Sequence, residues 1–236
     1  MPPQEPDMRP PGAVHDCSLP QWAVDKMTRR RGRRYAHETI DPVKTALVII
    51  DLMRNAIRDT PCAASIVAPC ARLAQHVRRT GGVVAWVYPQ PITADAPGSK
   101  AIWGDRHLQK NVEETAEDSP DRLPADGLVQ DTRDLIVRKS SPSAFFPGRC
   151  DLPDRLAGRG IDTVLITGVL TNICCESSAR DAATLGYKVI MVADANAARS
   201  DEEHRSALYN ILRNFGDVRM SNDLIALLGG ASERRT

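Results

Sequence analysis

The stretch TVLITGVLTNICCESSARDAATLGYKVIMVAD, residues 163–194, decides the fold. It begins and ends with a continuously apolar run, at 163–168 and at 188–194, and the segment between them has helical spacing with a glycine near its end. Short apolar runs of this kind are typical of strands buried on both faces, and a helical crossover joins two parallel strands. The stretch therefore predicts a strand, a helix and a second strand parallel to the first.

The same alternation extends through most of the chain. Further apolar runs lie at 45–51, 83–88 and 135–139, and helical spacing recurs at 65–82 and 150–160. Regular alternation of strands and helices predicts an α/β domain with three layers, in which helices cover both faces of a doubly wound, mostly parallel sheet.

A last helix and a short strand are predicted near the C-terminus. Ser200 and Glu203 have the spacing of a capping box, which predicts a helix from Ser200 to about Phe215. A short strand follows near DVRM, residues 217–220, and brings the expected number of strands to about six.

Length and composition predict one domain preceded by an arm. The chain has 236 residues, of which 42% are hydrophobic, and this is enough to bury one core without division into two domains. Residues 1–40 are rich in Pro and Arg and lack sustained periodicity. We therefore expect an N-terminal arm over 1–40, extended or wrapped around another subunit, and a single domain over 41–236.

The charge balance favours a small-molecule substrate. The chain has 31 basic and 30 acidic residues, so its net charge of +1 creates no strong field toward nucleic acid or a membrane surface. The arginine cluster at 29–34 lacks interleaved aromatic residues, which favours a solvated or subunit-wrapping segment over a nucleic-acid contact. We expect neither a nucleic-acid partner nor a membrane partner.

The expected location is the cytoplasm. No apolar run approaches the roughly 20 residues that span a bilayer, and the N-terminal residues lack the apolar core of a secretory signal. The cysteines lack the paired short spacings of a zinc site, so we expect reduced thiols, most of them buried. These cysteines are Cys17, Cys62, Cys70, Cys150, Cys174 and Cys175.

A long segment, residues 89–131, separates the second and third predicted strands. It contains several Pro and Gly residues and has weak helical patterning around AIWGDRHLQKNVEETAE. Loops of this length in compact domains are usually functional lids or disordered segments. We expect a lid.

Three chemically active side chains follow three of the predicted strands. Asp51 and Lys139 each close an apolar run, and Cys174 comes shortly after the run at 163–168. The carboxyl ends of parallel strands meet at one edge of a sheet, where the ligand crevice forms. Taken singly, each residue has an ordinary explanation as a strand-end cap, a surface lysine or a core cysteine. Their combination indicates a site.

The two adjacent cysteines have different predicted roles. If Thr171 caps the helix, Cys175 lies in line with the alanines four, seven and eight positions later, on an apolar face that packs inward. Cys174 is rotated by about 100° and lies in the first turn, where free N–H groups and the helix dipole favour a thiolate. Cys174 is therefore the candidate nucleophile, and Cys175 is expected to be structural.

These motifs strongly resemble those of the isochorismatase-like cysteine hydrolases, in particular the N-carbamoylsarcosine and ureidoacrylate hydrolases. The resemblance covers about 40–228. It rests on ALVIID ending at Asp51, KSSPSAF at 139–145, GVLTNIC at 168–174 and ESSARDA at 176–182, and it includes ADANAARSDEEH and FGDV further on.

The resemblance implies a sheet order and a set of site residues. The family's order 3-2-1-4-5-6 makes strands one and four neighbours, so Lys139 on strand three has to reach inward. Asp51, Lys139 and Cys174 fall on the family's catalytic triad. The Val169–Leu170 bond matches its cis peptide, and the backbone amides of Leu170 and Cys174 match its oxyanion hole. The resemblance implies no cofactor, and it implies a homo-oligomer, a dimer or a tetramer.

The residues after Asp51 depart from the family pattern. Many relatives read DMQNDF there, whereas this chain reads DLMRNAI, with Met53 in place of Gln and Ala56 in place of an aromatic residue. We expect an altered substrate pocket. Two interpretations of the loop stay open: Arg54 or Asn55 contacts a carboxylate-bearing substrate, or the loop is solvated.

Aromatic residues supply further pocket candidates. Trp86, Tyr88 and Phe145 are expected either to shape the pocket or to fill the core, and Phe145 has the best claim because it lies in the motif that carries Lys139. For His204, in the first turn of the last predicted helix, a helix-surface or packing role is favoured over catalysis.

The resemblance also bears on metal binding. Nicotinamidases of this superfamily usually carry an Asp and histidines beyond the second strand that bind a metal. The corresponding segment here reads WVYPQPITADAPG and contains no histidine, the next being His107. No metal site is expected, and nicotinamide is disfavoured as the substrate.

Three functional hypotheses follow. The first is a metal-free cysteine hydrolase that cleaves a C–N bond in a small amide, carbamoyl or ureido compound through a thioester-type intermediate and releases ammonia or an amine. The second is another hydrolysis on the same fold, such as that of a vinyl ether, although relatives with that activity typically lack the cysteine. The third is a catalytically silent binding or assembly protein, which has no chemical need for a complete triad.

Overall fold

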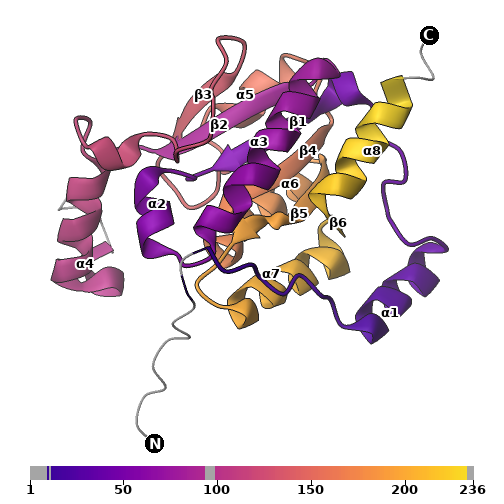
Figure 1. Cartoon of the computed structure of the whole chain (residues 1–236), viewed down its shortest axis with the longest axis horizontal. Helices are drawn as coiled ribbons and strands as arrows, with labels where there is room; N and C mark the ends of the chain where they lie inside the picture. Colours follow the sequence, from indigo (N-terminus) through magenta and orange to yellow (C-terminus); the bar gives the residue numbers. More distant parts are fainter. Residues whose placement is uncertain (1–9, 11, 94–98, 233–236) are drawn as a thin grey trace, which may run out of the picture.

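A six-stranded parallel sheet forms the centre of the molecule (Figure 1). The structure is a computed structural model and describes residues 10, 12–93 and 99–232. The order of the strands is β3-β2-β1-β4-β5-β6, as expected. The strands are β1 (Thr45–Ile50), β2 (Val83–Pro89), β3 (Leu135–Lys139), β4 (Thr163–Val169), β5 (Lys188–Ala197) and β6 (Asp217–Arg219).

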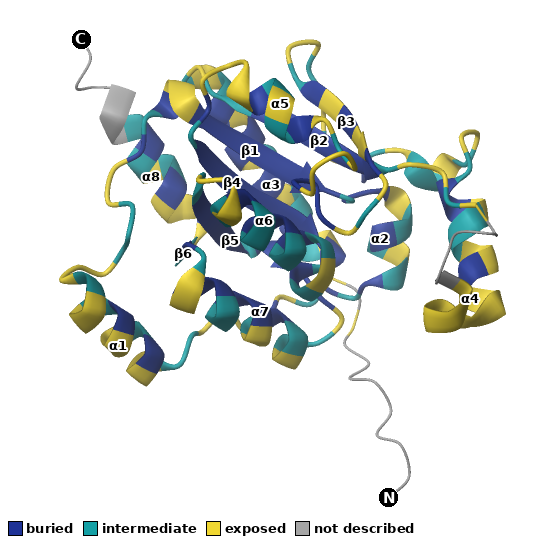
Figure 2. Cartoon of the chain, turned by 180° about the vertical axis from the view of Figure 1, so that it is seen from behind, coloured by how far each residue is buried: buried dark blue, intermediate teal, exposed yellow. Residues whose placement is uncertain are grey.

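Helices cover both faces of this sheet, which confirms the predicted three-layer architecture (Figure 2). One face is covered by α3 (Ala63–Arg79) and α8 (Ser221–Ser232), and the other by α5 (Leu152–Ala157), α6 (Glu176–Thr184) and α7 (Asp201–Asn214). The remaining helical elements are α1 (Gln21–Arg31), η1 (Pro42–Lys44), α2 (Arg54–Asp59), α4 (Ser99–Thr115), η2 (Pro120–Arg122) and η3 (Thr171–Cys175).

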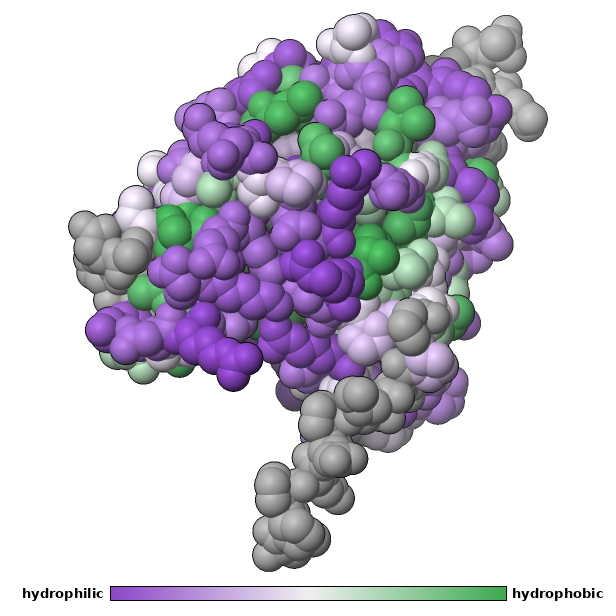
Figure 3. All heavy atoms as spheres, turned by 60° about the vertical axis from the view of Figure 1, so that its left-hand side comes forward, coloured by the Kyte–Doolittle hydropathy of each residue, from purple (hydrophilic) through white to green (hydrophobic). Residues whose placement is uncertain are grey.

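The surface differs sharply from this interior. The face that carries α4 is mainly hydrophilic, with small and separate hydrophobic areas (Figure 3). In the part of the chain that the structure describes, none of the helices combines the length and hydrophobicity needed to span a bilayer.

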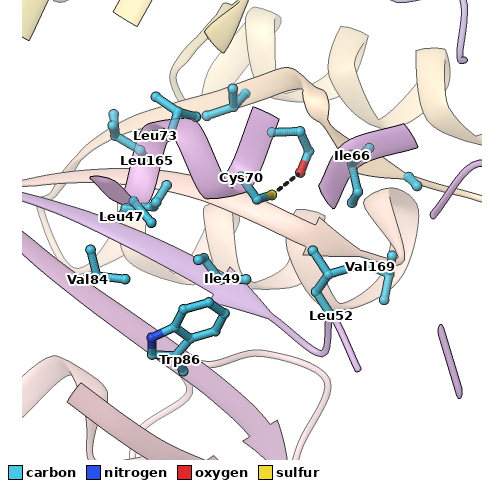
Figure 4. Packing of buried hydrophobic residues seen from close by; sticks show 14 of the residues in the cluster. Leu47, Ile49, Leu52, Ile66, Cys70, Leu73, Val84, Trp86, Leu165 and Val169 are labelled. Atoms are coloured by element: carbon cyan, nitrogen blue, oxygen red, sulfur yellow. Dashed lines mark hydrogen bonds between the residues drawn. The ribbon is translucent and has the colours of Figure 1, made fainter. Parts of the chain in front are cut away.

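Alternation along the strands divides the core into two parts. On β1, Leu47 and Ile49 point to the face of α3 and α8, whereas Val48 and Ile50 point to the face of α5, α6 and α7. Figure 4 shows the first of these cores, in which Trp86 lies beside Ile49 and the Cys70 thiol donates a hydrogen bond of 3.6 Å to the Ala195 carbonyl oxygen. Each aliphatic side chain that is fully buried here stabilises the fold by about 1.5–3 kcal/mol.

Gly168 allows β4 to end close against β1. A Cβ atom at this position would lie 2.0 Å from the carbonyl oxygen of Ile50, and the glycine has a φ of +119° that L side chains rarely adopt. Glycine is therefore required at this contact. The contact fixes the end of β4 beside the residue that precedes Asp51.

The described part of the N-terminal arm contains the helix α1 in place of extended backbone over that stretch, and the alternative of an arm that wraps around another subunit stays a prediction. In α1, Ala23 and Met27 are one turn apart and bury their side chains against Leu212 of α7. The helix ends at Gly32, which has the left-handed conformation that favours glycine. Residues 1–9 and 11 of the predicted arm lie outside the described residues.

The last predicted helix begins where its cap indicated. The Ser200 hydroxyl accepts a hydrogen bond from the Glu203 backbone N–H, while the Glu203 carboxylate accepts one from Arg199 rather than from Ser200. The helix runs to Asn214 and β6 follows, as expected. After β6 the chain forms α8, which was not predicted.

The described part of the segment 89–131, called the lid below, contains α4 and η2, and its covering of the site stays a prediction. Helix α4 is interrupted at Gly104, whose φ of 74° and ψ of 162° are not helical, and η2 begins behind Ser119, whose side chain caps it. Residues 94–98 of the predicted lid lie outside the described residues.

Candidate active site

Asp51 follows β1 in an unusual backbone conformation. Its φ of 51° is left-handed, which aspartate tolerates better than most residues, and its N–H donates a hydrogen bond of 2.9 Å to the Val87 carbonyl of β2. The carboxylate is 14% exposed. Its Oδ1 atom is buried and has no hydrogen-bond partner within the protein, which leaves an acceptor free for chemistry.

Lys139 reaches across the sheet edge from the end of β3. Its Nζ atom lies 2.9 Å from Asp51 Oδ2 and 3.3 Å from Cys174 Sγ, and it also donates to the Ser141 carbonyl at 3.2 Å. The side chain is 5% exposed. Although β2 separates β3 from β1, the lysine bridges the ends of both strands, which is the inward reach that the sheet order demanded.

Cys174 lies on η3, a π-helical turn between β4 and α6. The Cys175 N–H donates to the Leu170 carbonyl at 3.2 Å, a hydrogen bond that spans five residues. Ser178 anchors the turn, because its hydroxyl donates to the Cys174 carbonyl at 2.6 Å and accepts a bond of 2.9 Å from the Ala144 N–H. This turn presents the Cys174 thiol to Lys139.

The difference between the two cysteines agrees with the sequence analysis. Cys175 is completely buried in the core among residues that include Ala179 and Ala182, whereas Cys174 is half-buried at the edge of that core. The assumed cap at Thr171 is wrong, however. Its hydroxyl shares a hydrogen bond of 2.9 Å with His204 Nδ1 instead of capping the helix, and the helical turn begins directly after Leu170.

The electrostatics of the site favour a resting thiol. Burial raises the pKa of Cys174 to about 12, the charge of Asp51 adds to this rise, and the charge of Lys139 opposes it. Burial would by itself lower the pKa of Lys139, but the neighbouring Asp51 carboxylate and the contact with Cys174 raise it. The thiolate expected from a first-turn position is therefore not the resting form, because burial outweighs the helix dipole at this π-helical turn.

The Val169–Leu170 peptide bond is cis, as expected from the resemblance. It stands between the end of β4 and the turn that carries Cys174. Leu170 is followed at once by Thr171, and its carbonyl also accepts a hydrogen bond of 3.1 Å from Ile173. The bond thus lies at the point where the chain leaves the sheet.

Two of the candidate pocket residues belong to the core in this structure. Trp86 is 0% exposed and donates from Nε1 to Asp134 Oδ2 at 2.7 Å. Phe145 is also 0% exposed and meets the Tyr187 ring edge-on at 5.5 Å. These contacts support the core interpretation that the sequence had left open for both residues.

The other two candidates lie at the boundary of the lid. Tyr88 is 4% exposed, and its hydroxyl accepts a hydrogen bond of 2.9 Å from Gln130. Asn55 donates from Nδ2 to Glu114 Oε2 at 3.3 Å, and its Oδ1 atom is buried without a partner. The free amide oxygen of Asn55 is an acceptor that a bound substrate could use.

The residues around Asn55 connect the lid to the domain. Arg54 pairs with Asp126 at 3.0 Å, so its guanidinium already has a partner in the lid. Arg58 contacts Glu114 of α4 and lies 3.0 Å from Asp121 of η2. The loop at 52–56 is therefore part of the lid contact and not a freely solvated segment.

Sequence reasoning missed the residues that support the catalytic turn. Ser178 and the Thr171–His204 pair form hydrogen bonds that support the turn, and His204 is completely buried. This excludes the helix-surface role for His204 and agrees with a packing role. The spacing of Ser178, four residues after Cys174, was a usable signal for the first contact. His204 could not be paired with Thr171 from spacing, because 33 residues separate them.

The side chains that could hold a metal do not gather in the described structure. Over residues 10, 12–93 and 99–232, His, Cys, Asp and Glu side chains form no group of three or more that is arranged to hold a metal ion.

Comparison with known proteins connects this geometry to a family. Residues 45–223 match the isochorismatase domain. An uncharacterized isochorismatase family protein of Bacillus subtilis, YwoC, is 34% identical over 193 residues, covering 79% of this chain and 95% of the relative. The ureidoacrylate amidohydrolase RutB of Methylobacterium radiotolerans is 30% identical over 202 residues, covering 76% of this chain and 77% of the relative.

Solved structures give the same result. A cysteine hydrolase from Pseudomonas syringae pv. phaseolicola superimposes with a TM-score of 0.72 at 28% identity, covering 84% of this chain and 98% of that one. The N-carbamoylsarcosine amidase from Thermoplasma acidophilum superimposes with a TM-score of 0.63 at 28% identity, covering 75% and 96%.

Proposed function

Since this chain belongs to the isochorismatase family, we propose that it is a metal-independent cysteine amidohydrolase that cleaves a C–N bond in a small amide, carbamoyl or ureido compound. One observation carries the proposal. The Lys139 ammonium lies within 2.9 Å of the Asp51 carboxylate and 3.3 Å of the Cys174 thiol, so a base, a cation and a nucleophile from three strand ends meet at one point.

The relatives support this class of reaction. They include a ureidoacrylate amidohydrolase, an N-carbamoylsarcosine amidase and a cysteine hydrolase. The first two names describe hydrolysis of an amide-type C–N bond in a small molecule. A charge balance near zero is compatible with such a substrate, because the molecule carries no strong field toward a polyanion.

The first half of the reaction forms a covalent intermediate. Asp51 accepts the thiol proton of Cys174 as the sulfur attacks the substrate carbonyl carbon, and the carbonyl π electrons move to its oxygen. The backbone N–H groups of Leu170 and Cys174 donate hydrogen bonds to this oxyanion. Loss of one such donor in other enzymes raises the barrier by about 2.7–4 kcal/mol.

The second half releases both products. The tetrahedral intermediate collapses, the C–N bond breaks, and the leaving nitrogen takes the proton from Asp51 and departs as ammonia or an amine. Asp51 then accepts a proton from a water molecule while the oxygen of that water attacks the thioester carbon. The C–S bond breaks, the sulfur takes the proton from Asp51, and the acid product leaves.

Lys139 serves both halves through its charge. The Lys139 ammonium pairs with the Asp51 carboxylate and stabilises the Cys174 thiolate as it forms. Because the resting pKa of the thiol is about 12, proton transfer to Asp51 has to be coupled to attack on the substrate. The lysine thus stabilises charge where the reaction creates it.

The substrate pocket is proposed to lie between the triad and the lid. Asn55, which retains an unused amide oxygen, and Tyr88 are its candidate contacts from the sequence analysis. Met53 takes the place of the Gln found in many relatives and is 3% exposed, so it supplies an apolar wall rather than an amide. The protein is proposed to act in the cytoplasm, as a homo-oligomer and without a cofactor.

The test of this function is ammonia release from ureido acids, biuret-like compounds and primary carboxamides. The wild-type protein is compared with Cys174→Ala and with the matched control Cys175→Ala, which removes the neighbouring buried sulfur. Loss of activity in the first variant and its retention in the second support the proposal. Full activity of Cys174→Ala would show that the nucleophile is wrong, and wild-type hydrolysis of a vinyl ether instead of these compounds would show that the reaction class is wrong.

A further inference from the structure

Two buried histidines lie behind the turn that carries Cys174. His204 on α7 is 0% exposed and His15 of the N-terminal segment is 7% exposed. Their rings are stacked, with centroids 4.4 Å apart and planes 5° from parallel. The proposed reaction uses neither of them, so their position calls for a physical explanation.

His204 is connected directly to the catalytic turn. Its Nδ1 atom shares a hydrogen bond of 2.9 Å with the hydroxyl of Thr171, a residue that is itself 0% exposed. Burial lowers the pKa of His204 to about 3, so the ring is neutral near neutral pH. A neutral imidazole and a hydroxyl form one directional bond, and burial protects that bond from competition by water.

His15 holds His204 in place from the other side. The His15 Nε2 atom accepts a hydrogen bond of 3.0 Å from the Ala198 N–H, which leaves the proton on Nδ1, and Nδ1 donates at 2.7 Å to Asp201 Oδ1. Cys17 adds a further contact, since its Sγ atom lies 3.7 Å from His204 Nε2. The stacked rings therefore have a fixed orientation.

Thr171 is well placed to transmit this support. It is the first residue of η3, it directly follows Leu170, and it lies three residues before Cys174. A rotation of this turn would move the Cys174 thiol relative to Lys139, which it contacts at 3.3 Å, and would move both amides of the proposed oxyanion hole. Displacements of about 1 Å in a reacting group can reduce a rate about a hundredfold.

We propose that His204, backed by His15, is a positioning residue that fixes the catalytic turn through the Thr171 hydroxyl. The N-terminal segment, which lies outside the matched region 45–223, would then be part of the machinery that holds Cys174 in register with Lys139 and Asp51. This inference rests on the proposed function for its catalytic meaning. The position of the turn also affects the reactivity of the Cys174 thiol in the absence of any substrate.

The test measures the rate at which iodoacetamide alkylates Cys174, followed by peptide mass spectrometry, so that no substrate has to be known. Thr171→Val removes the hydroxyl at nearly constant volume, whereas Thr171→Ser keeps it. We expect the rate to change by about tenfold or more in Thr171→Val and to stay within about twofold of wild type in Thr171→Ser. An unchanged rate in Thr171→Val, or an equal change in both variants, would overturn the role of the hydroxyl.

A second pair of variants tests the N-terminal segment. His15→Ala removes the stacking and both hydrogen bonds, and it is expected to shift the alkylation rate in the same direction as Thr171→Val. Trp22→Ala is the matched control, because Trp22 contacts Tyr209 on the same helix α7 at 5.7 Å but has no contact with Thr171 among those described. If both variants lower the melting temperature but neither changes the rate, the segment has a structural role alone and the proposal fails.

The two proposals fail in distinguishable ways. If Thr171→Val alters alkylation but the wild type hydrolyses none of the amide compounds, the positioning role stands and the proposed reaction does not. If the amide compounds are hydrolysed and Thr171→Val keeps the wild-type kcat, KM and alkylation rate, the reaction stands and the positioning role is wrong.

Discussion

At the scale of single residues, the Cys174 thiol is favoured over the thiolate, because burial and the charge of Asp51 raise its pKa to about 12. The sequence placed Asp51, Lys139 and Cys174 at one sheet edge because each follows a recognisable strand, and their catalytic roles stay a prediction. The high pKa of the thiol could not be predicted, since it depends on burial and on the distance to Asp51. These quantities are set by the fold and not by the local sequence.

The charge state leads to a prediction for Asp51→Asn. Because the Asp51 charge raises the pKa of Cys174, its removal should lower this pKa and speed alkylation by iodoacetamide near neutral pH by about threefold to tenfold. Ammonia release should fall by about a hundredfold or more, since the proton acceptor is lost. Alkylation rates and turnover are measured on the same samples.

The pH dependence provides the control for this result. The pKa of about 12 lies above the usual working range, so the thiolate fraction and the alkylation rate of the wild type should rise about tenfold for each unit of pH. A plateau near pH 7 would mean that the thiolate is already the resting form. Slower alkylation of Cys174 in Asp51→Asn would contradict the conclusion that the Asp51 charge raises the pKa of this thiol.

At the scale of elements, five of the six strands were predicted from continuous apolar runs, and the sixth from a short stretch after the last predicted helix. The π-helical turn η3 was missed because the sequence pattern of 171–175 does not distinguish a π-helical turn from the first turn of an α-helix, whereas Gly168 fixes the preceding strand end against β1. Helix α1 was missed because Pro and Arg dominate its surroundings, although Ala23 and Met27 have helical spacing. For α1, a tertiary contact decides the local structure.

Helix α8 shows the same limit of local patterns. It includes Gly229, and glycine weakens a helix pattern by about 1 kcal/mol relative to alanine. Leu224 and Leu228 are nevertheless 0% exposed and pack on the core with α3. The helix is stabilised by this burial, which the sequence alone does not reveal.

The lid yields a prediction at the same scale. Arg58 of α2 pairs with Glu114 of α4, whose side chain is 11% exposed, and with Asp121 of η2. Arg58→Met removes the guanidinium that pairs with the largely buried Glu114 carboxylate, and this loss should lower the local stability by about 1–2 kcal/mol. Hydrogen exchange of the amides in α4 should become about fivefold to thirtyfold faster.

A matched variant separates this effect from a general loss of charge. Lys100→Met removes an ion pair with Asp105 in which both side chains are well exposed, at 68% and 75%, so little change in exchange is expected. Equal exchange in wild type and Arg58→Met would show that these ion pairs do not hold the lid.

At the scale of the whole molecule, the described N-terminal segment packs on its own domain. Arg31 pairs with Asp217 at 3.1 Å, and Arg219 donates to the His37 carbonyl at 2.6 Å. A surface for the proposed second subunit has to be sought among side chains that these contacts leave exposed. Ile102 and Trp103 of α4 are 79% and 41% exposed, and exposed apolar residues of this size suit an interface.

Light scattering coupled to gel filtration tests the proposed homo-oligomer. The wild type should have a mass two or four times the 25.8 kDa of the chain. The oligomer of the double variant Ile102→Ser with Trp103→Ser should dissociate at a higher protein concentration than the wild type, because apolar area is removed from the interface. Trp22→Ser, which changes an exposed tryptophan on α1, is the control, and a monomeric wild type would refute the assembly.

The proposed mechanism requires that the Cys174 sulfur forms a covalent bond to the substrate. The most direct measurement is mass spectrometry of acid-quenched Cys175→Ala protein during turnover of a compound that releases ammonia, with fragment ions that locate the adduct. We predict an added acyl mass on Cys174 that disappears when the substrate is exhausted. An acyl group on any other residue would show that Cys174 is not the nucleophile.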